Sequence, residues 1–216
     1  MPPPDDTKAR ILEAAHRRLA REGYSALSMR EIAKDAGVNH ALINYHFRSK
    51  DQLVIAVLDE ANRLLLDRQQ RMYREPVGFA EKWAQARRFY RSDLASGFVR
   101  VQGELWAASF SNPGLRAKLL PRFNAWKDLV REGVREAFAA LEAAGVALPA
   151  PITPEVAATW IYEFWVGMEF SDLLGDREEG ARHRAALDAM EKLLEDLDAR
   201  VARTAKAAPR ARRKAA

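Results

Sequence analysis

Apolar residues recur at intervals of three and four along most of this chain, and that spacing limits what it can fold into. Ile11, Ala15 and Leu19 place one apolar stripe along a helix, and Leu53, Val57, Ala61 and Leu65 place another. Sustained alternation of apolar and polar residues is absent, and the sequence contains no Asn-Gly or Asp-Gly pair of the kind that closes a β-hairpin. The pattern predicts an all-α protein.

Start and stop signals divide the chain into about nine helices. Gly23 and Gly37 are helix-stop residues. Ser28 with Glu31, and Ser49 with Gln52, are capping-box patterns. Asn39, Asn112-Pro113 and Thr153-Pro154 are typical helix starts. The expected helices cover about 7–22, 28–35, 39–45, 49–73, 77–95, 100–111, 114–144, 154–174 and 180–203. Pro121 is expected to kink or break the seventh of them.

Charge and composition exclude several classes of protein. The chain has no cysteine, so it has no disulfide and no thiolate chemistry. The N-terminal residues MPPPDDTKAR contain no apolar signal region, and the longest uncharged runs are too short to span a bilayer, so we expect a cytoplasmic protein. The net charge of +5 comes from the C-terminal end, because Arg200–Ala216 holds seven basic residues and no acid while residues 1–199 sum to −2. We expect residues 204–216 to be a disordered basic tail.

Two short predicted helices joined at Gly37 have the dimensions of a helix-turn-helix. In that motif the second helix enters the major groove of DNA. His40 and Asn44 are four residues apart and therefore share one face, where Asn44 can pair with adenine. Ala41 and Leu42 suit a thymine methyl group, whereas Ile43 and Phe47 suit packing against the first two helices. Tyr45, His46 and Lys50 follow at the helix end, within reach of phosphates.

The segment SMREIAKDAGVNHALINYHFRSKDQL, Ser28 to Leu53, resembles the DNA-binding signature of the TetR family of transcriptional repressors. The matching positions are Ser28, Ile32, Ala33, Ala36, Gly37, Val38, His46, Phe47, Lys50 and Leu53. Asn39, Ala41 and Asn44 depart from the residues common in the family. The departure at Asn44 bears on which operator is read, and Asn39 replaces a serine as the helix cap.

The resemblance implies an N-terminal three-helix DNA-binding domain, residues 1–52, and a C-terminal helical ligand-binding and dimerisation domain, residues 53–203. By matching position it implies that bases face Arg30, His40, Ala41, Leu42 and Asn44, with Asn39 at the helix start. It implies that phosphates face Ser28, Tyr45, His46 and Lys50. The expected partners are a palindromic operator in double-stranded DNA, a second copy of the chain and a small-molecule effector that releases the DNA.

The second part of the chain supplies candidates for the other two sites. A ligand pocket lined by aromatic and acidic residues is one interpretation of this part, and ordinary core is the other. The pocket candidates are Glu104, Trp106, Phe110, Phe123, Trp126, Tyr162, Trp165 and Glu169. For the dimer interface, the nearly all-apolar helix 154–174 and a coiled-coil-like seam in the last helix supply Trp160, Phe164, Gly167, Leu187, Met190, Leu194, Leu197 and Val201.

Catalysis and metal binding have little support in the sequence. No carboxylate is placed to orient His40 or His46 as a base, and no metalloprotease, EF-hand or P-loop pattern occurs. We therefore expect no enzyme activity and no cofactor. Two alternatives remain open: a helical carrier or enzyme that retains the DNA-binding motif, and an activator or corepressor-dependent regulator in which the ligand tightens DNA binding.

Overall fold

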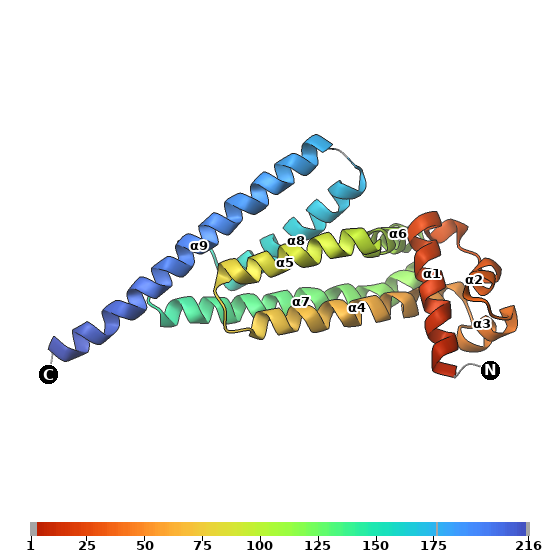
Figure 1. Cartoon of the computed structure of the whole chain (residues 1–216), viewed down its shortest axis with the longest axis horizontal. Helices are drawn as coiled ribbons and strands as arrows, with labels where there is room; N and C mark the ends of the chain where they lie inside the picture. The colour runs from red at the N-terminus through yellow and green to blue at the C-terminus, as the bar shows by residue number, and fades with distance from the viewer. Residues whose placement is uncertain (1–3, 176, 215–216) are drawn as a thin grey trace. The chain divides into compact units, whose positions relative to one another are not determined.

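A computed structural model describes residues 4–175 and 177–214, and within them the secondary structure is entirely helical (Figure 1). The elements are α1 (Pro4–Ala26), α2 (Met29–Ala36), α3 (His40–His46), α4 (Lys50–Arg74), α5 (Phe79–Ser96), α6 (Phe98–Ser111), α7 (Pro113–Ala143), α8 (Pro154–Leu173) and α9 (Arg177–Lys214). The predicted all-α fold is confirmed, and each expected helix has a counterpart, in most cases within a few residues of its expected bounds.

Local signals explain where several of these helices begin. The side chain of Asn112 accepts a hydrogen bond from the amide of Leu115 at 3.0 Å, and Thr153 accepts one from the amide of Val156 at 3.3 Å. Ser49 accepts from the amide of Gln52 at 3.1 Å at the start of α4. These three caps are confirmed.

The predicted capping box at Ser28 is wrong, since the Ser28 side chain makes no capping hydrogen bond. The Glu31 carboxylate that should complete the box instead lies 3.3 Å from the guanidinium of Arg18 in α1. A tertiary ion pair therefore takes the place of the expected local hydrogen bond to the backbone.

Two helices differ from expectation. Helix α7 continues through Pro121 without a break. Helix α9 continues to Lys214 through most of the segment expected to be a disordered tail. Alanine, arginine and lysine all have high helix propensity, so the composition of that segment permits a helix even without an apolar face.

The chain forms two compact units. The first comprises residues 1–67 and 92–125, and the second comprises residues 68–91 and 126–216, so α4, α5 and α7 each contribute to both. In the first unit α1 packs against α2 and α6, and α2 packs against α3. Its core contains fully buried Ile11, Leu19, Ile32, Ile43, Leu53, Leu58, Leu105 and Leu115.

The second unit is built around aromatic and aliphatic side chains. Val130, Val134, Ala158 and Tyr162 form one buried cluster of α7 and α8. Trp83 of α5 packs against Trp165 of α8, with ring centroids 5.0 Å apart. Helix α9 packs on α8. Two ion pairs from Arg87, to Asp188 and Glu191, and a hydrogen bond from Trp83 to the Leu187 carbonyl at 3.0 Å attach α9 to α5.

Candidate nucleic-acid interface

Helix α3 turns one face to the solvent and the other to the core. His40, Ala41, Leu42, Asn44 and Tyr45 are all exposed, with Tyr45 81% exposed and Leu42 41% exposed. The Nδ2 atom of Asn44 lies 3.5 Å from Nδ1 of His40, so the expected shared face of these two side chains is present. This face therefore offers amide and imidazole groups beside short apolar ones, which are the groups needed to distinguish base edges.

The opposite face of α3 fixes the helix to its support. Ile43 is fully buried and Phe47 is 4% exposed. At the start of the helix, the Asn39 side chain accepts a hydrogen bond from the amide of Ala41 at 2.9 Å, which confirms the predicted N-cap. The exposed face is thus held by buried apolar contacts behind it and by a cap at its beginning.

The turn between α2 and α3 contains Gly37 and is closed by Arg10, a residue that the sequence interpretation did not single out. Gly37 adopts the left-handed conformation, with φ 62° and ψ 39°, which an L side chain rarely adopts. The guanidinium of Arg10 in α1 donates hydrogen bonds to the carbonyls of Ala36 and Gly37. These contacts join residues 26 and 27 positions apart, so no local sequence signal indicates them.

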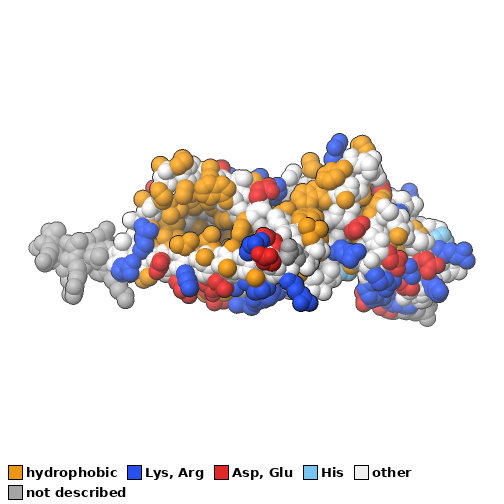
Figure 2. Space-filling model, turned by 90° about the horizontal axis from the view of Figure 1, so that it is seen from above, with side chains coloured by type: hydrophobic (Ala, Val, Ile, Leu, Met, Phe, Trp, Pro, Cys, Tyr) orange, Lys and Arg blue, Asp and Glu red, His pale blue; other side chains and the backbone are white. Residues whose placement is uncertain are grey.

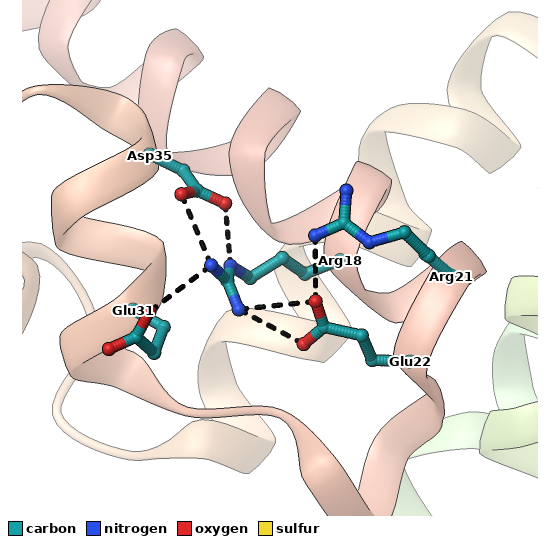
Figure 3. Close-up of polar contacts among 5 residues, drawn as sticks. All are labelled: Arg18, Arg21, Glu22, Glu31 and Asp35. Atoms are coloured by element: carbon teal, nitrogen blue, oxygen red, sulfur yellow. Dashed lines mark hydrogen bonds and ion pairs between the residues drawn. The ribbon is translucent and has the colours of Figure 1, made fainter.

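A network of charged side chains holds α1 to α2 (Figure 3). Arg18 donates to both carboxylate oxygens of Asp35, at 2.6 Å and 3.1 Å, and also contacts Glu22 and Glu31. Hydrogen bonding to Arg18 lowers the pKa of Asp35, and hydrogen bonds from Arg21 and Arg18 lower the pKa of Glu22. Both carboxyl groups are therefore held in their charged form beside the helix-turn-helix.

The residues expected to contact phosphate have different surroundings. Tyr45 is exposed, and its ring stacks edge-on against His46 with centroids 5.2 Å apart. Ser28 is partly buried and Arg30 is exposed. Lys50 is engaged within the protein, because its Nζ atom lies 4.3 Å from the centroid of the Tyr24 ring and 3.4 Å from the carbonyl of Ser25. Burial lowers the pKa of Lys50. Phosphate contact by Lys50 stays a prediction, and it requires the ammonium group to leave these contacts.

The aromatic and acidic residues expected to form one ligand pocket are divided between the two units. Glu104, Trp106, Phe110 and Phe123 belong to the first unit, and Trp126, Tyr162, Trp165 and Glu169 belong to the second. Glu104 accepts a hydrogen bond from the amide of Tyr24 at 3.0 Å, Trp106 stacks on Phe123 at 5.2 Å, and Phe110 is 76% exposed. Trp126 donates to Gln69 at 2.9 Å, and Tyr162 belongs to the buried cluster of α7 and α8.

The second unit does contain a cavity of about 440 Å³, and Trp165 is the one expected residue that lines it. Its walls come from the end of α4, the start of α5, α7, α8 and α9. Figure 2 shows a hollow walled by hydrophobic side chains on one face of the molecule. The sequence interpretation missed the other lining residues because alanines and aliphatic residues carry no distinctive signal.

The residues expected at a dimer interface also divide into two groups. Trp160 is 59% exposed, Met190 is 37% exposed and Gly167 is exposed. Phe164 and Val201 are partly buried, and Phe164 packs on Trp83 with centroids 6.0 Å apart. Leu187 is buried within its own chain, and Leu194 and Leu197 line the cavity. Part of the coiled-coil-like seam of α9 therefore faces the chain's own second unit.

Two other kinds of site have no counterpart in the part of the chain that the structure describes. There, no three histidine or acidic side chains are grouped in a way that could hold a metal ion. No helix among the described residues combines the length and the apolar character needed to cross a membrane.

Comparison with known proteins identifies the N-terminal segment. Residues 11–57 match the family model described as bacterial regulatory proteins, tetR family. The segment is similar to the HTH-type transcriptional repressor Rv3405c of Mycobacterium tuberculosis, with 49% identity over 55 residues that cover 26% of this chain and 29% of that protein. It is also similar to the regulator TtgR of Pseudomonas putida, with 41% identity over 54 residues, 25% of this chain and 26% of that protein. These similarities span less than a third of the relatives' length.

Solved structures match a much larger share of the chain. A TetR-family transcriptional regulator from Agrobacterium tumefaciens aligns with a TM-score of 0.72 at 17% identity, covering 89% of this chain and 99% of the other. FadR of Bacillus subtilis, in complex with stearoyl-CoA, aligns with a TM-score of 0.69 at 19% identity, covering 86% of this chain and 96% of the other. At these identities the likeness shows the fold. The predicted resemblance to the TetR family is confirmed for the N-terminal segment, residues 11–57.

Proposed function

We propose that this protein is a transcriptional regulator that binds a palindromic DNA operator as a homodimer and releases it when a small molecule binds, and so acts as a repressor. The exposed face of α3 carries the proposal. It presents His40, Ala41, Leu42 and Asn44 on a short helix whose back is fixed by Ile43 and Phe47. A helix presented in this way fits the major groove of DNA.

Dimerisation is proposed on the apolar surface of the last two helices. Trp160, Leu193 and Leu174 are 59%, 63% and 85% exposed, which is unusual for large apolar side chains. A palindromic operator also requires a two-fold protein, and its half-sites would lie one DNA turn apart, roughly 34–36 Å. Size measurement in solution, with Trp160→Glu expected to give monomers, tests this part of the proposal.

Release of DNA is proposed to start at the cavity of the second unit. Met72 and Tyr73, which line the cavity, belong to α4, and the same helix begins at Lys50 beside the helix-turn-helix. A ligand that prefers one position of α4 would shift the population of DNA-binding conformations. The neighbour FadR was solved with stearoyl-CoA bound, which supports a small-molecule effector without identifying one here.

The test begins by selecting binding sequences from a random DNA library with the intact protein. Dissociation constants are then measured on the selected sequence and on a scrambled one. Asn44→Ala is expected to weaken binding to the selected sequence by about 1–3 kcal/mol and to leave binding to the scrambled sequence nearly unchanged. Asn124→Ala is the matched control, because Asn124 is also an exposed helical asparagine of the first unit.

Equal and negligible effects of Asn44→Ala and Asn124→Ala would contradict base recognition by α3. Failure to enrich any sequence would contradict the regulator proposal altogether. A ligand that tightens DNA binding would contradict the repressor proposal and indicate a corepressor-dependent regulator or an activator. Chemical turnover of the ligand without any effect on DNA affinity would indicate an enzyme or carrier.

A further inference from the structure

The cavity of the second unit is almost entirely apolar. Its aromatic walls are Tyr73, Phe79, Trp83, Phe138 and Trp165, and aliphatic or alanine side chains make up most of the rest. Its volume of about 440 Å³ lies in the range of small-molecule sites, which are typically lined by apolar groups with a few polar ones. The few polar groups therefore decide which ligand it accepts.

Charged groups of the lining do not favour a charged ligand. Only Glu75, Lys82 and Glu136 carry charge among the lining residues, and both glutamates are exposed to solvent. The Lys82 ammonium donates to the carbonyl of Tyr73 at 2.5 Å, and Glu75 accepts a hydrogen bond from Gln85 at 2.6 Å. An anion would meet two carboxylates and a committed ammonium group, and a cation would find no buried carboxylate. Burying either without a partner is costly.

Tyr73 provides one polar group that remains for a ligand. Its hydroxyl has no hydrogen-bond partner within the described residues, and burial raises the pKa of Tyr73 to about 12. The phenol is therefore protonated at neutral pH and can donate a hydrogen bond. The indole N–H of Trp83, by contrast, already donates a hydrogen bond to the carbonyl of Leu187.

Gly133 leaves room for the Tyr73 ring. A Cβ atom at residue 133 would lie 2.3 Å from Cδ1 and 2.5 Å from Cε1 of Tyr73, far inside van der Waals contact. Gly133 stands inside α7, where glycine is about 1 kcal/mol less favourable than alanine. An alanine at this position would favour the helix, but its Cβ atom would collide with the Tyr73 ring at the cavity wall.

We propose that the cavity binds a neutral, largely apolar molecule through one acceptor atom, a carbonyl, ether or hydroxyl oxygen, that receives a hydrogen bond from Tyr73. The inference deepens the proposed function, since it assigns a chemical class to the effector. The acidic pocket candidates named from the sequence, Glu104 and Glu169, do not line this cavity, and Glu104 accepts a hydrogen bond from the Tyr24 amide.

The test uses two sets of probes, each with one skeleton and different polar groups. The first set is 2-acetylnaphthalene, 2-naphthoate, 2-(aminomethyl)naphthalene and naphthalene, and the second is 2-decanone, decanoate and decylamine. Binding to the full chain is measured by calorimetry and by tryptophan fluorescence, since Trp83 and Trp165 line the cavity. We expect a ketone to bind saturably, and its acid and amine counterparts to bind at least about tenfold more weakly.

Three variants locate the binding. Tyr73→Phe should weaken ketone binding about two- to thirteenfold, the range of one net hydrogen bond, and should leave naphthalene binding unchanged. Tyr45→Phe, on exposed α3, is the matched control and should change neither. Gly133→Ala should displace the Tyr73 ring and weaken the ketone as well. Because Tyr73→Phe removes a hydroxyl without a partner, the variant should fold as the parent does.

Tighter binding of the acid or the amine than of its ketone would overturn the proposal. So would unchanged ketone affinity in Tyr73→Phe, or the absence of saturable binding by both ketones. None of these measurements involves DNA. If the ketones bind through Tyr73 while α3 shows no base recognition, the site assignment stands and the regulator proposal fails. If α3 recognises bases while the ketones do not bind through Tyr73, the regulator proposal stands and the site assignment fails.

Discussion

Asp198 of α9 caps the start of α5, and its removal tests how the second unit is held together. The Asp198 carboxylate accepts hydrogen bonds from the amides of Phe79 and Ala80, at 2.9 Å and 3.0 Å. Gly78 leaves the necessary room, since a Cβ atom there would lie 2.5 Å from the carboxylate. The contact joins residues 119 positions apart, so it is a tertiary contact that also serves as a helix cap.

The expected magnitude follows from those two bonds. Loss of an N-terminal cap costs about 0.5–2 kcal/mol, and loss of a negative charge at a helix N-terminus costs a further 0.3–1 kcal/mol or so. Asp198→Ala should therefore destabilise this region by about 1–3 kcal/mol. The stability of Asp198→Asn should fall between those of the parent and of Asp198→Ala, because an amide oxygen can still accept a hydrogen bond but carries no charge.

Hydrogen exchange gives the local measurement and urea unfolding the global one. The amides of Phe79 and Ala80 should exchange about 5- to 160-fold faster in Asp198→Ala, the equivalent of 1–3 kcal/mol. Asp196→Ala is the control, because Asp196 is an exposed aspartate on the same helix. The reasoning is refuted if Asp198→Ala and Asp196→Ala give the same exchange rates at these two amides.

Three further predictions concern the helix-turn-helix. Ile43→Ala should cost about 2–5 kcal/mol in urea unfolding because Ile43 is fully buried, whereas Leu42→Ala, at a position 41% exposed, should cost far less; similar costs would contradict the two-faced α3. Asn39→Ala should cost about 1 kcal/mol through loss of the cap, and no loss would mean that the cap contributes nothing. The third concerns acid: the pKa of Asp35 lies below its ordinary 3.8, mainly through Arg18, so this stabilisation is present above that value and is lost as the pH falls through the folded-state pKa. Arg18→Ala should flatten the acid side of the stability–pH curve, and an unchanged curve would refute the assignment.

Sequence patterns predicted the helices well because their signals are local. Asn39, Asn112 and Thr153 each cap through an amide two or three residues away, so composition and spacing suffice to locate them. The exposed face of α3 was predicted for a similar reason, since side chains four apart on a helix share a face.

Contacts between distant segments were beyond the reach of those patterns. Glu31 has the right spacing to complete a capping box with Ser28, yet it lies beside Arg18. Leu194 and Leu197 repeat like a coiled-coil seam, yet they line a cavity of their own chain. Spacing along one helix says which residues share a face; it does not say which neighbour that face meets.

The first unit is assembled from two separated stretches of chain, residues 1–67 and 92–125. Its helix α1 packs on α6, and the amide of Tyr24 binds Glu104, 80 positions later. On the ribosome, the helix-turn-helix therefore emerges long before the helix that completes its support. Closing that long loop costs conformational entropy before any contact offsets it. Helix α1, against which α2 packs, therefore lacks its partner α6 until residues 98–111 have been synthesised.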